Sequence, residues 1–202
     1  MISFEKNDEM QNSPPEKPAL LIIDMVKDNL DPDHPLPITP FANQIITPIN
    51  TLIKMFRKEN WPVVFSTDAY HEQDFIFTGR LQPHSLEGTR GAEIAGGLDY
   101  RPETDTWLPK RRFSAFFQTG LEKFLHEKKV TLCALAGITT SYCVLATMMD
   151  ALCHDFKAVL LEDCTAAYPQ STHESILAVY RRNPMYPLLR VESSVDLGQV
   201  VY

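Results

Sequence analysis

The 202-residue chain contains no apolar run near the ~20 residues that a membrane-spanning helix requires. Its first residues, MISFEKNDEMQNSPPEKP, are polar and contain no apolar core of a secretory signal. An excess of positive charge is also missing, because the formal net charge is -7 and the isoelectric point is about 5.3. Nucleic acids and anionic membranes bind basic surfaces, so we expect neither as a partner. A cytoplasmic protein is the simplest interpretation of these absences.

The sequence contains few cysteines, and none are spaced as a pair. The four cysteines form no Cys-x-x-Cys motif, which argues against a zinc knuckle or a redox dithiol; they are Cys133, Cys143, Cys153 and Cys164. Free thiols are typical of a reducing compartment. Three of them fit packing positions within strands or at a helix end. Cys143 differs, because it follows small and hydroxyl residues just where a helical pattern begins.

Short apolar runs alternate with amphipathic segments along the chain. Strands are expected at 18–24, 61–67, 105–110, 130–137, 158–164 and 186–191. Helices are expected at 41–60 (with Pro48 kinking it), 119–129, 141–156, 172–183 and 193–201, with Thr119 and Thr172 as helix N-caps. Strands that are apolar throughout and alternate with helices predict a three-layer α/β/α fold with a mainly parallel, roughly six-stranded sheet. We expect a flexible leader at 1–17 and a single domain at 18–202.

Polar residues follow several of these strands. Asp24 ends the first strand, Lys110 ends the third, and Cys143 follows the fourth. In an open parallel sheet, sites form beyond the carboxyl ends of the strands, so an acid, a base and a thiol are predicted at one rim. Each residue alone has a plain alternative, since Asp and Lys are common in turns. Their convergence favours a functional site.

Cys143 is expected in the first turn of its helix, with Thr140 or Ser141 as the N-cap. The helix dipole and unpaired N–H groups there favour a thiolate, and Lys110 would favour it further. Asp24 could accept the thiol proton and pass it to a leaving group. The alternative is that Cys143 is a small buried apolar residue.

Three segments together resemble one family. LLIIDM with Asp24, LPKRRFSAFFQTGL with Lys110 and AGITTSYCVLATMMDA with Cys143 resemble the isochorismatase-like cysteine hydrolases over roughly Pro18 to Arg190. The resemblance implies an Asp24–Lys110–Cys143 triad that cleaves a C–N bond of a small amide, carbamoyl or ureido compound through a thioester. It also implies a cis peptide between Ile138 and Thr139, with the N–H groups of Thr139 and Cys143 forming an oxyanion hole.

Within this family, the TTS segment is similar to N-carbamoylsarcosine amidohydrolases, whereas nicotinamidases more often carry Asp at the position of Ser141. Nicotinamidases also bind a divalent metal through an Asp-x-His pair and a later His. Here the matching residues are Asp68, His71 and His84, but the first pair reads Asp-x-x-His. Such a set would suit zinc, iron or manganese. The alternative is a structural role for both histidines, with no cofactor required.

Aromatic residues near the motifs are expected to bind substrate, namely Tyr142, Phe113 and Tyr70. The resemblance further implies a homo-oligomer, either a dimer or a tetramer. Three alternative functions remain besides the leading hypothesis. They are a metal-assisted nicotinamidase, a non-hydrolytic binding relative, and a redox-sensing thiol protein for which no resolving cysteine is evident.

Overall fold

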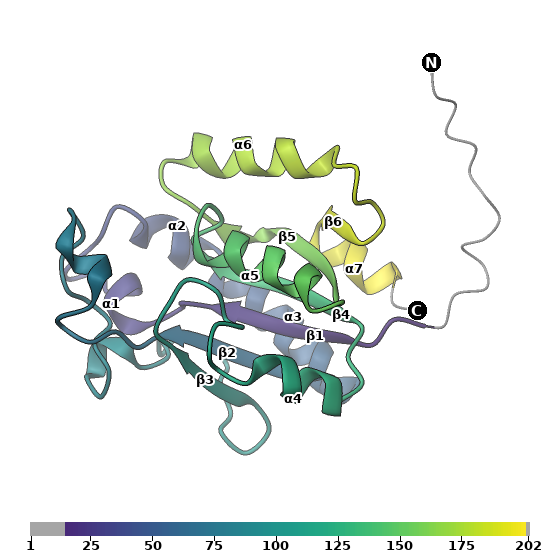
Figure 1. The fold of residues 1–202 in the computed structure, drawn as a ribbon, viewed down its shortest axis with the longest axis horizontal. Helices are drawn as coiled ribbons and strands as arrows, with labels where there is room; N and C mark the ends of the chain where they lie inside the picture. Colours follow the sequence, from purple (N-terminus) through teal and green to yellow (C-terminus); the bar gives the residue numbers. More distant parts are fainter. Residues whose placement is uncertain (1–14, 201–202) are drawn as a thin grey trace.

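The structure, a computed structural model, describes residues 15–200. Six parallel strands form a single sheet in the order β3-β2-β1-β4-β5-β6 (Figure 1). The strands are β1 (Pro18–Ile23), β2 (Val63–Asp68), β3 (Thr106–Lys110), β4 (Leu132–Ile138), β5 (Lys157–Ala166) and β6 (Leu189–Glu192). All pairs run parallel, so the predicted three-layer α/β/α class is confirmed.

Helices cover both faces of the sheet. One face packs against α2 (Thr39–Gln44), α3 (Ile46–Lys58) and α7 (Ser194–Val200), and the other against α4 (Leu121–Glu127), α5 (Cys143–Cys153) and α6 (Gln170–Arg181) (Figure 1). Alternation along β1 explains the two cores, because Leu20 and Ile22 face one layer while Leu21 and Ile23 face the other. Short helical turns complete the chain: α1 (Lys27–Leu30), η2 (Phe75–Thr78) and η3 (Arg90–Ala92).

Helix starts differ from the sequence-based expectation. The helix predicted at 41–60 is two helices, and Pro48 lies in the first turn of α3, where a missing N–H costs no intrahelical bond. The residue before α4 is Gly120 in a left-handed conformation (φ 79°), not Thr119. Helix α6 starts after Pro169 rather than at Thr172.

The predicted leader falls mostly on residues 1–14, which lie outside the described residues. Glu16, by contrast, forms ion pairs of 2.8 Å with both Lys157 and Arg190. The main-chain carbonyl of Lys17 accepts a hydrogen bond from Thr131. These contacts hold Glu16 and Lys17 against β4, β5 and β6. Within the described part of the chain, no helix has the length and apolar character needed to cross a membrane.

Candidate active site

The carboxyl ends of β1, β2 and β3 bring three charged side chains together. Lys110 Nζ donates to Asp24 Oδ2 at 2.9 Å and is also ion-paired with Asp68 Oδ1. The second oxygen of Asp24 accepts the main-chain N–H of Asp68 at 2.8 Å. All three side chains are buried, so two carboxylates and one ammonium share a site from which water is largely excluded.

A close approach between β1 and β4 positions Asp24. Gly137 pairs with Ile23 and has a φ of +103°, and a Cβ atom there would lie 2.1 Å from the Ile23 carbonyl oxygen. Only glycine fits this contact. Asp24 itself adopts a positive φ of 53°, and its main chain is held by Ser66 at 2.9 Å and by the Asn29 amide at 3.0 Å.

Cys143 is the first residue of α5 and is almost fully buried. Its sulfur and carboxylate oxygens of Asp24 and Asp68 all lie within 4.8 Å of one another, so the thiol lies close to both carboxylates. The helix N-cap is Tyr142, without a side-chain cap, rather than the predicted Thr140 or Ser141. The predicted convergence of acid, base and thiol at one rim is present in the structure.

The protonation of the thiol differs from the expectation. Burial raises the pKa of Cys143 well above its usual value of 9.0, and the nearby Asp24 charge raises it further, although Lys110 opposes both. Burial likewise raises the pKa of Asp24 to about 7, with Asp68 adding to the shift. Both shifts favour a neutral thiol beside a carboxyl group that can accept its proton near neutral pH.

Lys110 keeps its charge within this cluster. Burial alone would lower its pKa, but the carboxylate of Asp24 and the other acidic groups around it raise that pKa well above 10.5. An ammonium fixed between two carboxylates offsets part of their mutual repulsion. Asp68 is thus a fourth member of the cluster.

The segment between β4 and α5, residues 139–142, surrounds the sulfur from the other side. The peptide bond between Ile138 and Thr139 is cis. The Thr139 carbonyl accepts the N–H of Tyr142 at 3.1 Å and that of Val144 at 3.2 Å. Cys143 is the first residue of α5, so no carbonyl of a preceding helical turn is available to accept its main-chain N–H. It is free to bind a ligand atom.

The predicted substrate-binding aromatics occupy two environments. Tyr142 and Phe113 are exposed and contact each other, with ring centroids 6.1 Å apart, next to the nucleophile position. Tyr70 is buried, and burial followed by the charge of Asp68 raises the pKa of its phenol far above the usual range. Its ring packs against Phe77 and His84.

The predicted metal ligands do not converge. Asp68 is turned toward Lys110, His71 Nε2 pairs with Glu87 at 2.7 Å, and His84 Nδ1 pairs with the carbonyl of Gln82 at 2.9 Å. Spacing alone could not reveal these competing partners. Among the described residues, the group with metal-ligand geometry is Asp24, Asp68 and Cys143. Both of its carboxylates already neutralise the Lys110 ammonium, so this set does not fit a divalent cation.

Two contributors were not recognised in the sequence. The sequence predicts Asp68 as a metal ligand, whereas the structure pairs it with Lys110. His173, in α6, is buried and its Nδ1 lies 2.9 Å from the Thr140 hydroxyl, inside the 139–142 segment. The available signal for His173 was its position four residues before Leu177, which places both on the buried face of a helix.

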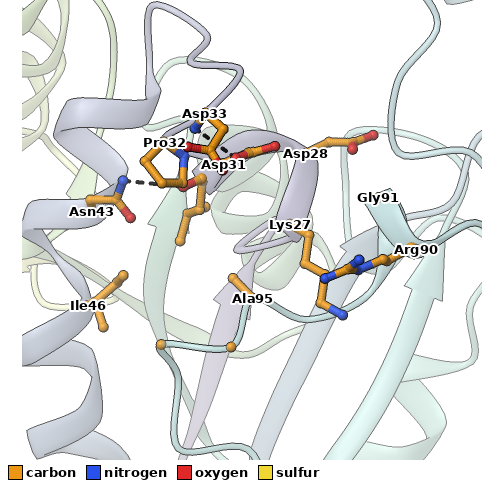
Figure 2. A pocket seen from close by; sticks show the side chains of 13 residues that line it. Lys27, Asp28, Asp31, Pro32, Asp33, Asn43, Ile46, Arg90, Gly91 and Ala95 are labelled. Atoms are coloured by element: carbon orange, nitrogen blue, oxygen red, sulfur yellow. Dashed lines mark hydrogen bonds between the residues drawn. The ribbon is translucent and has the colours of Figure 1, made fainter.

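A cavity of about 670 Å³ is formed by residues other than those of this centre (Figure 2). Its lining comes from residues 27–33 after β1, from Asn43 and Ile46 of α2 and α3, and from the 90–97 segment. Asp28 is not free, because its Oδ2 accepts the main-chain N–H of Ser85 at 2.7 Å. The cavity contains neither Cys143 nor Lys110, so it is separate from the thiol centre.

Comparisons of sequence agree with this geometry. The isochorismatase domain profile matches residues 18–191. The chain is 31% identical to the uncharacterized isochorismatase family protein PncA of Bacillus subtilis over 166 residues, covering 78% of this chain and 90% of the relative. It is 30% identical to the maleamate amidohydrolase of Pseudomonas putida, covering 80% of this chain and 78% of that enzyme.

Solved structures give the same result. N-carbamoylsarcosine amidase from Thermoplasma acidophilum superposes with a TM-score of 0.75 at 28% identity, covering 88% of this chain and 96% of that one. The pyrazinamidase of Pyrococcus horikoshii, solved in complex with zinc, gives 0.73 at 27% identity, covering 88% and 99%. The fold, the matched profile and the similar amidohydrolases together establish that the chain belongs to the isochorismatase family of hydrolases.

Proposed function

We propose that the protein is a cysteine hydrolase that cleaves the C–N bond of a small amide, carbamoyl or ureido compound. Asp24, Lys110 and Cys143 act as the catalytic triad. The observation that carries the proposal is the cluster in which Cys143 Sγ lies within 4.8 Å of an Asp24 carboxylate oxygen, while Lys110 Nζ donates to Asp24 at 2.9 Å. A packing cysteine needs no such neighbour, and the other buried cysteines of the described chain, Cys133 and Cys164, lie in strands.

In the first half of the reaction, Cys143 Sγ bonds to the carbonyl carbon while its proton passes to the Asp24 carboxylate. The carbonyl electrons move to oxygen, and the N–H groups of Thr139 and Cys143 stabilise that oxyanion. The C–N bond then breaks. The nitrogen keeps the electron pair, takes the proton from Asp24 and leaves as ammonia or an amine, so a thioester remains.

In the second half, water attacks the thioester carbon while Asp24 accepts its proton. The C–S bond breaks, the sulfur regains a proton and the acid product leaves. Lys110 holds Asp24 in place at 2.9 Å and balances the negative charge that appears on Asp24 and on the sulfur. A base with a pKa near the working pH is well suited to alternate between these two roles.

Metal-assisted nicotinamide hydrolysis is the less favoured alternative, because His71 and His84 are bonded to Glu87 and Gln82 instead of to a shared ligand position. No metal is needed for the steps above. We further propose that Tyr142, Phe113 and Tyr70 contact the substrate, and that the protein assembles as a homo-oligomer.

Ammonia release from a panel of amides and ureides tests the function. The panel holds nicotinamide, pyrazinamide, N-carbamoylsarcosine, maleamate and simple ureides. We expect turnover of at least one compound, and Cys143→Ala to lower it by at least about a thousandfold. Cys164→Ala is the matched control, because it removes another buried free thiol, and should retain activity. Turnover that survives in Cys143→Ala, or no turnover across the panel, would contradict the proposal.

A further inference from the structure

The 139–142 segment is fastened to the rest of the domain at Thr140. Its main-chain N–H donates to the carbonyl of Ala166, the last residue of β5, at 2.9 Å. Its hydroxyl meets Nδ1 of His173 at 2.9 Å. Thr140 is fully buried and His173 nearly so, so water does not compete for this hydrogen bond.

The ring of His173 has a defined orientation. Nδ1 faces the Thr140 hydroxyl at 2.9 Å. A neutral imidazole has one donor and one acceptor nitrogen. Nδ1 is the hydrogen-bond partner of the buried Thr140 hydroxyl, so it accepts the hydroxyl hydrogen and Nε2 carries the ring proton. Burial supports the neutral form, because it lowers the pKa of His173 below its usual 6.5.

This hydrogen bond also explains why Thr140 does not cap α5. A threonine side chain close to a helix start normally accepts an N–H of the first turn. Here the hydroxyl is turned away from α5 and toward α6, 33 residues later in the chain. The hydroxyl thus holds the segment that lies between Thr139 and Cys143.

We propose that His173 is a positioning residue that holds Thr140, and through it keeps the main-chain N–H groups of Thr139 and Cys143 aimed at one point. The inference rests on the proposed function, because those N–H groups are its oxyanion donors. His173 does not touch the substrate. It acts on the transition state only, since the oxyanion forms after substrate has bound.

Kinetics of matched variants test the role. Thr140→Val and His173→Leu each remove one partner, and a displaced donor should lower kcat by about ten- to a hundredfold with KM changed by less than about threefold. Thr140→Ser keeps the hydroxyl, and His173→Asn places an acceptor near Nδ1, so both should recover most of kcat. The double variant should lose about as much as either single variant, because the two share one interaction.

Thr165→Val is the control for loss of any buried threonine hydroxyl. Thr165 is buried, and its hydroxyl donates to the Leu161 carbonyl at 2.9 Å. If His173 has only a structural role, Thr140→Val and Thr165→Val should lower Tm by similar amounts and should have similar values of kcat. The proposal is overturned by that result, or by a His173→Asn variant no more active than His173→Leu.

A second readout does not depend on turnover. In ¹⁵N NMR of the wild-type protein, His173 should show a protonated Nε2 and an unprotonated Nδ1, and Thr140→Val should shift the Nδ1 signal. The alkylation rate of Cys143 by iodoacetamide should change in Thr140→Val and His173→Leu but recover in His173→Asn. If the protein hydrolyses none of the panel compounds, these measurements still decide whether His173 positions the segment. An unchanged alkylation rate in both variants would overturn it.

Discussion

The two sides of Cys143 are built from different chemistry. On one side, the ends of β1, β2 and β3 supply charges, with Lys110 paired to both Asp24 and Asp68. On the other side, the 139–142 segment is held by neutral hydrogen bonds, including that between Thr140 and His173. In the proposed mechanism, the charged side moves protons, whereas the neutral side holds the main-chain geometry. Substitutions on the two sides should therefore have different kinetic signatures.

Burying the charged side on folding also costs desolvation free energy, whereas the neutral side has no buried charge. A buried ion pair repays its desolvation only in good geometry, and removing one partner leaves an uncompensated charge. The neutral pair carries no such charge. Variants of Asp24, Asp68 or Lys110 should thus alter stability, activity and pH dependence together, while variants of Thr140 should lower kcat without shifting the pH dependence.

The largest effect is expected from Asp24→Asn. The amide cannot accept the thiol proton, so kcat should fall by about a hundredfold to ten-thousandfold while the substrate still binds. Steady-state kinetics on the substrate identified by ammonia release provides the measurement. A variant with kcat within a factor of about two of the wild type would show that another group is the base.

Lys110→Met should affect both activity and folding. It leaves Asp24 and Asp68 facing each other without a cation, which should lower the free energy of unfolding by about 3–5 kcal/mol. Urea denaturation measures this loss. Lys128→Met, at an exposed lysine, is the control and should change stability by less than about 0.5 kcal/mol. Equal stability of the two variants would contradict the buried network.

The pH dependence of kcat/KM distinguishes the charged side of Cys143 from the neutral side. Asp24 must be ionised to act as the base, and its raised pKa of about 7 means that kcat/KM should fall as pH decreases through that value. Asp68→Asn removes a charge that raises this pKa and frees Lys110 to pair with Asp24 alone. Both changes should move the acid limb to lower pH.

Asp105→Asn is the control for this shift, because Asp105 is a buried carboxylate paired with Arg57 away from the thiol centre. Its acid limb should match that of the wild type. Thr140→Val should likewise keep the wild-type midpoint while lowering kcat. If the acid limb moves in Thr140→Val but not in Asp68→Asn, the roles of the two sides are the opposite of those proposed.

The smallest effect is expected from the residues predicted to hold a metal. His71 is half-exposed and bonded to Glu87, so His71→Gln should change kcat by less than about twofold. Dialysis against a strong chelator should have equally little effect, as measured by ammonia release before and after treatment. Activity lost on chelation and restored by zinc, iron or manganese would show that the metal-dependent alternative is correct.

The sequence was most informative where a residue's position follows from topology. Asp24 and Lys110 directly end apolar runs, and the ends of parallel strands meet at one rim, so their convergence could be predicted. The layer structure followed from the alternation of apolar strands and amphipathic helices. Gly137 carried no such signal, because its need to be glycine depends on contact with Ile23 in a neighbouring strand.

Side-chain partners were predictable only in part. The direction of Asp68 toward Lys110, and of His71 toward Glu87, depends on loop geometry that spacing does not encode. Thr140 satisfied the rule for a helix cap, yet its hydroxyl is engaged by a residue from another helix. Burial and the Asp24 charge, which raise the pKa of Cys143, likewise depend on tertiary contacts that the spacing does not encode.

The most direct test of the account is to trap the covalent intermediate. Purified protein is mixed with its substrate, quenched in acid within milliseconds and digested, and the peptide containing Cys143 is weighed by mass spectrometry. We predict an acyl adduct on Cys143 in the wild type that forms and decays with turnover, and its absence in Cys143→Ser at the same times. Ammonia released at the full rate with no adduct on Cys143 would contradict the central claim.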